Sequence, residues 1–260
     1  MKLTEKEILA NWEEFRKRIN TFGSRAKALN AMYDEIEERI VMMPASSVDH
    51  HHNAMPGGYV DHVLRVMDCS EKLYDVWQSM GADVSGFTKE ELLFAAMHHD
   101  LGKVGFPGEG NEAYIPNESE WHRKNQGKIY AHNPKIPFGL VPDISIWWLQ
   151  EHGVKMSWNE FQAIRIHDGL YDEANRAYFV SRSPDSKLRT PMAIILHHAD
   201  HMAARIEYDK WAANHTDVKP SSNVNMSYGK KAQAKKLADV ATSSNESSSD
   251  LQQVFNDLFG

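Results

Sequence analysis

The chain has 260 residues, of which 42% are hydrophobic and 25% are charged, the usual balance of a globular protein. Its formal net charge of −7 argues against a generally basic nucleic-acid-binding surface, so local cations or a metal must meet any anionic substrate. The single Cys69 excludes an intramolecular disulfide and a thiolate zinc cluster, and we expect it to be a small buried residue. No apolar run reaches the roughly 18 residues of a membrane span, and the amino terminus lacks an apolar signal segment. We therefore expect a cytoplasmic protein with no membrane contact.

Apolar residues recur at helical spacing along most of the chain, which predicts an all-α fold. The first segment, 1–43, is expected to form a helical hairpin that packs on the core. Thr4 and Glu7 form a capping box before a helix over about 5–20. Ser24 stands where it would cap the second helix of the hairpin.

Further helices and loops follow in a regular order. Residues 44–58 have the composition of a loop, and a helix follows the glycine pair that ends it. Thr88 and Ser157 begin two more capping boxes, and Pro191 is typical of the first turn of a helix. The helices so predicted cover about 59–80, the stretch from 89 to His99, 143–152, the stretch from 158 to His167, and a long last helix from 190, with loops over 102–140 and 169–189.

The composition changes after about residue 214. Residues 215–249 are rich in serine, asparagine, lysine and threonine, which predicts a low-complexity linker. Residues 250–260 place apolar groups at i, i+3, i+4, i+7 and i+8, the pattern of a short amphipathic helix. Such a segment docks on its own domain or binds a partner protein.

Fourteen histidines are many for this length, and most stand in clusters. His62, His99, Asp100 and Asp200 fall on three different predicted helices, at positions that should face inward. Asp200 is flanked by apolar residues, and burying such a carboxylate without a partner costs several kcal/mol. Two imidazoles and two carboxylates suit one or two divalent ions of Mn, Fe, Ni, Co, Mg or Zn.

The same residues carry a resemblance to a known family. His62, then HHDLGK over 98–103, then Asp200 in HHADHMAARIE resemble, in this order, the HD-domain superfamily of metal-dependent phosphohydrolases. The resemblance implies an all-helical hydrolase domain over 44–214. It also implies that His132 and His167 complete a second metal site with Asp100 as the bridging carboxylate. His98 is then expected on the adjoining face, as a packing residue or a support for the ligands.

Two narrower likenesses follow from longer stretches. The segment PASSVDHHHNAMPGGYVDHVLRVMD resembles the opening of the HD-type conjugative relaxases of the MOBH class. GGYVDH, HHDLGK and TPMAIILHHAD are also similar to the bacterial HD-domain 3′-to-5′ exoribonucleases. No OB-fold of the kind that the exoribonucleases carry is recognisable before the HD segment, and these 260 residues do not include the large flanking regions of a relaxase. A stand-alone enzyme that acts on nucleotides is therefore a further expectation.

Other polar residues are candidates for contact with substrate. His50, His51 and His52 lead into the His62 helix and are candidate general acids, or an exposed polar loop. Candidate phosphate-binding cations are Lys103, Arg123, Lys124 and Lys128.

Three functions are open at this point. The first is hydrolysis of a nucleotide phosphate ester by metal-activated water, with Asp100 central to the site. The second is a single-strand nuclease that uses the same metal site. The third is a non-catalytic metal-binding module that recruits a protein partner through 250–260.

Overall fold

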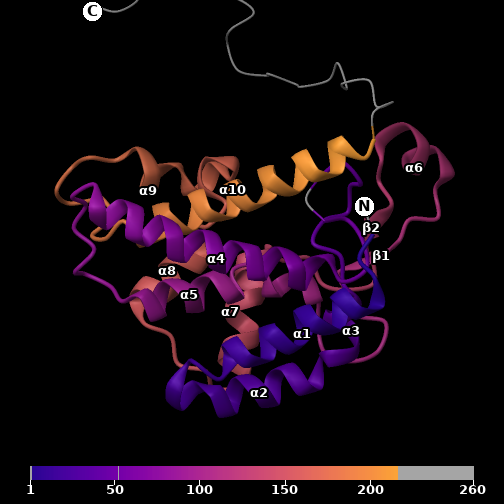
Figure 1. Ribbon diagram of the computed structural model, residues 1–260, viewed down its shortest axis with the longest axis horizontal. Helices are drawn as coiled ribbons and strands as arrows, with labels where there is room; N and C mark the ends of the chain where they lie inside the picture. Colours follow the sequence, from indigo (N-terminus) through magenta and orange to yellow (C-terminus); the bar gives the residue numbers. More distant parts are fainter. Residues whose placement is uncertain (1, 52, 216–260) are drawn as a thin grey trace, which may run out of the picture. The chain divides into compact units, whose positions relative to one another are not determined.

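The computed structural model describes residues 2–51 and 53–215 (Figure 1). They belong to the first of two units into which the chain divides, Met1–Thr216 and Asp217–Gly260. His52 and the predicted amphipathic segment 250–260 lie outside the described residues, as does nearly all of the predicted linker. In the described part of the chain, no helix is both long enough and apolar enough to cross a membrane.

Helices dominate the described chain, which confirms the all-α prediction. One small antiparallel sheet accompanies them. The elements are α1 (Glu5–Ile19), α2 (Ala26–Glu35), α3 (Glu37–Met42), α4 (Gly58–Ser79), α5 (Lys89–His98), β1 (Tyr114–Pro116), α6 (Glu120–Gln126), β2 (Tyr130–His132), α7 (Val141–Glu151), α8 (Trp158–Arg165), α9 (Arg176–Val180) and α10 (Met192–Ala213), with 3-10 turns at Gly23–Arg25, Leu101–Val104, Gly169–Tyr171 and Glu173–Asn175.

All three predicted capping boxes are present, at the starts of α1, α5 and α8. In each, a hydroxyl accepts the third backbone N–H of the helix while the glutamate at that position accepts the cap's own N–H. This pattern needs only four consecutive residues, which is why it can be read from the sequence.

The second helix of the predicted hairpin differs from expectation. It is two helices, because Ile36 leaves helical geometry at φ −113° and ψ 9° and packs into the core. Ser24 lies in a 3-10 turn, and α2 begins after Arg25 with no side-chain cap. The predicted cap at Ser24 is therefore wrong.

The segment 102–140 is more ordered than the predicted loop. It contains α6 and the β1–β2 pair, in which Tyr114 lies opposite His132. Two nearly buried amides hold it together: Asn133 Nδ2 donates to the carbonyls of Gly110 and Glu112, and Asn117 Nδ2 donates to that of Lys128. Side-chain bonds to the backbone leave no apolar periodicity, so the sequence gives no sign of these strands. The predicted loop 169–189 likewise contains α9.

Four helices surround the centre of the molecule. In Figure 1 the long α10 runs along α4, and α5 and α8 lie beneath them; contacts join α4 to α10 and α5, and α8 to α5 and α10. The small Ala95, Ala96 and Ala199 are fully buried where these helices meet. Small side chains allow helix axes to approach closely, so polar groups on all four helices converge on one place.

Candidate metal centre

His62 lies on the inner face of α4 and is fully buried. Its Nδ1 is 3.0 Å from Glu207 Oε2, and its Nε2 is 3.1 Å from Asp200 Oδ1. Both carboxylates come from α10, seven residues apart. Burial lowers the pKa of His62, but the charge of Glu207 and the bond to Asp200 outweigh this and raise it to about 10.

His99 and His167 are oriented by the ends of two helices. His99 Nδ1 donates to the carbonyl of Ala96 at 2.8 Å, and His167 Nδ1 donates to that of Ile164 at 2.9 Å. Carbonyls in the last turn of a helix have no partner within the helix, so they are available to fix an imidazole. In both residues the Nε2 atom is thereby left to face the interior as a ligand.

Asp100 lies between these imidazoles. Its Oδ2 is 3.4 Å from His99 Nε2 and 4.0 Å from His62 Nε2, and its Oδ1 is 3.6 Å from His167 Nε2. Burial alone would raise the pKa of Asp100, but the charges of Lys103 and His99 outweigh it and hold the pKa well below its usual range. The carboxylate is therefore ionised and ready to bind a cation.

Lys103 is the buried cation of the site. Its Nζ donates to Asp100 Oδ2 and, at 2.7 Å, to the carbonyl of Ala45. Burial lowers the pKa of Lys103, but Asp100 outweighs it and raises the pKa above its ordinary value. The predicted phosphate-binding lysine thus lies at the site and is bonded there to Asp100.

The donor atoms form two overlapping sets among the described residues. His62, His99 and Asp200 make one set, and His99, Asp100 and His167 make the other; within each set the ligand atoms lie within 4.8 Å of one another. His99 Nε2 is buried 3.4 Å from Asp100 Oδ2 and 3.9 Å from Asp200 Oδ1. A ring nitrogen buried beside two carboxylates fits a divalent cation with nitrogen and oxygen ligands.

The turn that carries His167 is held by α10. His197 Nδ1 donates to the carbonyl of His167 at 2.9 Å, and the His197 ring lies directly against Gly169. Gly169 has φ +57°, and a Cβ there would overlap the His197 ring. A glycine is needed at 169 for both reasons.

His132 lies on β2, exposed, with its ring 5.1 Å from that of Tyr114. It lines the same cavity of about 490 Å³ as Asp100, His167 and Asp200, but it belongs to neither ligand set among the described residues. Its place in a second metal site stays a prediction.

The other candidate residues lie elsewhere. His51 lines a small cavity with Glu207 and Trp211, and the His50 ring is 6.1 Å from that of Trp211. Arg123, Lys124 and Lys128 are exposed, in or just after α6. None of these five residues lines the cavity at Asp100. Their predicted roles as general acids and phosphate ligands stay predictions without support from this geometry.

The prediction that His98 lies away from the ligands as a packing residue is confirmed. It is fully buried, with its ring 4.3 Å from that of Phe94, and its Nδ1 donates to the Phe94 carbonyl. Cys69 is buried and free, as expected.

Glu207 is the important residue that sequence reasoning missed. It is 3% exposed and accepts bonds from His62 Nδ1 and from Arg65 Nε at 3.1 Å. The signal was available, because a residue seven positions after Asp200 lies two turns along the same face of a helix. To identify Glu207 as a partner of His62, however, one must know that this face of the helix is turned toward His62.

The profile of the HD-domain family matches residues 59–205, which is more than half of the chain. The chain therefore belongs to the HD-domain family, whose members are typically metal-dependent phosphohydrolases. No curated protein and no solved structure matched it. Its narrower likenesses to relaxases and exoribonucleases stay predictions.

Proposed function

We propose that the chain is a metal-dependent phosphohydrolase that cleaves a phosphate ester of a nucleotide. The observation that carries this proposal is the pair of ligand sets that overlap at His99, three members of which, Asp100, His167 and Asp200, line a cavity of about 490 Å³. That volume falls in the range of small-molecule sites. A divalent cation held there would supply Lewis-acid chemistry and lower the pKa of a bound water.

The ligands divide naturally between two ions. An imidazole Nε2 has one lone pair and binds one cation, whereas a carboxylate can bind one with each oxygen. Asp100 directs Oδ2 toward His62 and His99 and Oδ1 toward His167. We infer that His62, His99 and Asp200 would hold one cation, that His167 would hold the other, and that Asp100 would be shared between them.

The charge of the cavity supports a role for metal in binding phosphate. Its lining includes four aspartates, Asp100, Asp168, Asp172 and Asp200, against two cations: Lys103, which is bonded to Asp100, and His167, whose pKa is raised to about 9 by the bond to Asp100 and the charge of Asp168. Carboxylates in this excess repel a phosphate group. Divalent cations held there would reverse that repulsion, so we expect metal to be required for substrate binding as well as for hydrolysis.

A neighbouring cavity favours a nucleotide over a nucleic-acid strand. It measures about 810 Å³, and Lys103 is in the lining of both cavities. Tyr114 and Tyr130 line it and could stack bases, but five carboxylates line it too: Asp34, Glu35, Glu38, Glu109 and Glu112. A phosphodiester backbone requires cations along its path, and this lining is predominantly acidic.

The test combines metal analysis with a hydrolysis screen over nucleotides and short single-stranded oligonucleotides. We expect the wild type to bind metal and to hydrolyse nucleotides. Asp100→Ala should lose more than the roughly 100-fold that removal of a ligand's supporting partner costs. The matched control is Asp75→Asn, which removes an exposed carboxylate of α4 that pairs with Lys89.

Each alternative outcome has a distinct meaning. Equal hydrolysis by wild type and Asp100→Ala would show that the site is wrongly assigned. Cleavage of oligonucleotides alone would favour the nuclease. A wild type that binds metal, hydrolyses nothing and captures a protein through 250–260 would favour the regulatory module.

A further inference from the structure

Aromatic side chains stand at the mouth of the metal cavity. The cavity is lined at depth by Asp100, His167 and Asp200, and toward solvent by Phe138, Leu140 and Tyr171. Phe138 is 95% exposed and Tyr171 is 75% exposed. Large exposed rings beside a polar site mark a place where an apolar part of a ligand is covered.

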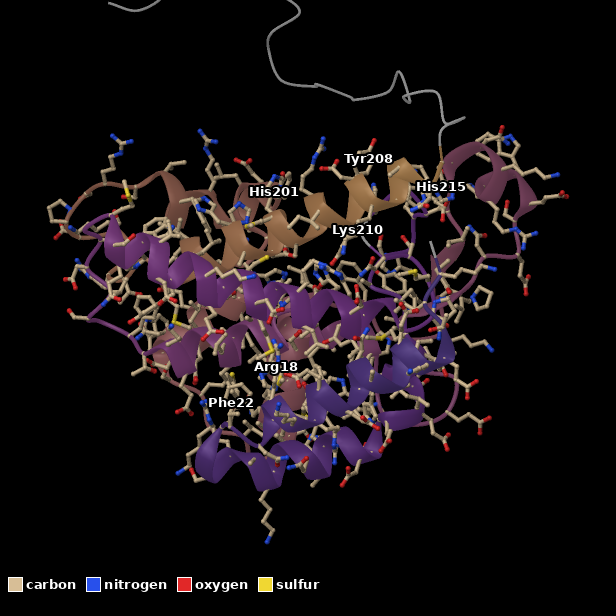
Figure 2. The ribbon with its side chains drawn as sticks, in the orientation of Figure 1. Arg18, Phe22, His201, Tyr208, Lys210 and His215 are labelled. Carbon is tan, nitrogen blue, oxygen red and sulfur yellow. The ribbon has the colours of Figure 1, made fainter. Side chains whose placement is uncertain are left out.

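Tyr171 is fixed in position before any ligand arrives. Its hydroxyl is 3.1 Å from His201 Nδ1, and the two rings lie at 22° with centroids 6.0 Å apart. His201 directly follows Asp200 on α10, where Figure 2 shows it on the outer side of the helix. The tyrosine is therefore tied to the helix that carries a metal ligand.

Phe138 stands on a different segment, just upstream of the Leu140 cap of α7. Gly139 follows it, and a Cβ at Gly139 would lie 3.1 Å from the Ile144 side chain. Pro142 then lies in the first turn of α7, where proline is favoured. This close packing fixes the backbone next to Phe138, while the ring itself lies in solvent.

We propose that Phe138 and Tyr171 form a stacking site for the flat ring of the substrate, whose phosphate group reaches the ligands below. This inference rests on the proposed function and narrows its substrate to a compound with a heteroaromatic ring, such as a nucleoside. Aromatic side chains can stack on any of the bases, because every base has a π-face.

Carboxylates beside the ligands limit the number of phosphate groups. Asp168 is 46% exposed, and its Oδ1 lies 3.7 Å from His167 Nε2; Asp172 lines the same cavity. A second or third phosphate held in this cavity would lie close to these carboxylates and be repelled. The substrate class is therefore a nucleoside monophosphate.

The test measures binding, so that it does not depend on hydrolysis. Calorimetry with Mn²⁺-loaded protein would use the phosphonate analogues of adenosine 5′-monophosphate and of ribose 5-phosphate, whose P–C bonds resist hydrolysis. We expect the wild type to bind the adenosine analogue about tenfold more tightly, the order of one stacking contact. The double variant Phe138→Ala, Tyr171→Ala should reduce this preference to less than twofold and leave the ribose analogue's Kd unchanged.

Two further variants and one further ligand sharpen the result. Tyr171→Phe keeps the ring and should keep most of the preference, and Trp158→Ala, which removes a 68% exposed ring outside the cavity, should keep all of it. The phosphonate analogue of ATP should bind the wild type at least tenfold more weakly than the monophosphate analogue.

The outcomes separate this inference from the proposed function. A preference that survives in the double variant, or a wild type that shows no preference or binds neither analogue, overturns the stacking site. Equal affinity for the triphosphate analogue overturns the limit to one phosphate. If the preference depends on the two rings but no nucleotide is hydrolysed, the stacking site stands and the proposed hydrolysis fails.

Discussion

The end of α5 places two adjacent histidines in opposite surroundings, although both are fully buried. His98 packs among aromatic rings, 4.3 Å from that of Phe94 and 6.0 Å from that of Tyr33, and burial lowers its pKa to about 3. His99 turns the other way, toward Asp100 and Asp200.

The metal-site side behaves differently because of its carboxylates. Burial lowers the pKa of His167 too, but the bond to Asp100 and the charge of Asp168 outweigh it and raise the pKa to about 9. The pKa of His62 rises to about 10 in the same way, through Glu207 and Asp200. Burial alone therefore gives a neutral packing histidine, whereas burial beside carboxylates gives a histidine that holds a positive charge. A metal supplies such a charge in place of the proton.

Substitution of Glu207 should have the largest effect on the metal side of this comparison. Glu207→Gln removes the charge that most raises the pKa of His62 and weakens the orientation of its ring. We expect metal affinity at pH 9 to fall about 10- to 100-fold. In the wild type, apparent affinity should keep rising with pH toward 10, because a proton and the metal compete for His62; in the variant the rise should end at lower pH.

Competition titrations with a metal indicator would measure both effects. The matched control is Asp209→Asn. Asp209 lies on the same helix, and its side chain is 66% exposed. A Glu207→Gln variant with unchanged affinity and unchanged pH dependence would show that His62 does not depend on Glu207.

Substitution of Gly169 should disturb the same side through its backbone. Gly169→Ala places a Cβ against the His197 ring at φ +57°, so the turn that carries His167 must shift. The control, Gly153→Ala, has a similar φ of +64° and open space around its Cβ. Thermal unfolding should show a loss of about 1 kcal/mol for the control and a larger loss for Gly169→Ala, and metal affinity should fall only in the latter. Equal losses would show that His197 does not constrain the turn.

Substitution of His98 should leave metal affinity unchanged and alter the pH dependence of the unfolding free energy. Because its folded pKa is lowered from 6.5 to about 3, His98 contributes stability that is present above pH 6.5 and lost as the pH falls toward 3. His98→Leu should therefore lose less unfolding free energy than the wild type over that range, by an amount of order a few kcal/mol, with metal affinity at pH 7.5 unchanged. Denaturant unfolding across pH would measure this, with the exposed His122→Leu as control. Equal acid losses in wild type and His98→Leu would contradict the assignment.

The sequence by itself determined the helical class, the three capping boxes and the principal ligand candidates. Capping boxes lie within four residues, and apolar periodicity is local, so both can be read without the fold. Asp200 could be recognised as a candidate ligand from the sequence, because a carboxylate in an apolar helix requires a partner. The placement of His62, His99 and Asp200 in one set of donor atoms agrees with that expectation.

Only the tertiary structure decided which polar residues meet. It separated His98 from His99, joined Glu207 to His62 across 145 residues, and placed Phe138 and Tyr171 on one cavity. It also paired β1 with β2, two strands of three residues each that are too short to show a periodic signal. Contacts between distant segments depend on how helix faces are turned toward each other, and that orientation is set by packing of the whole core.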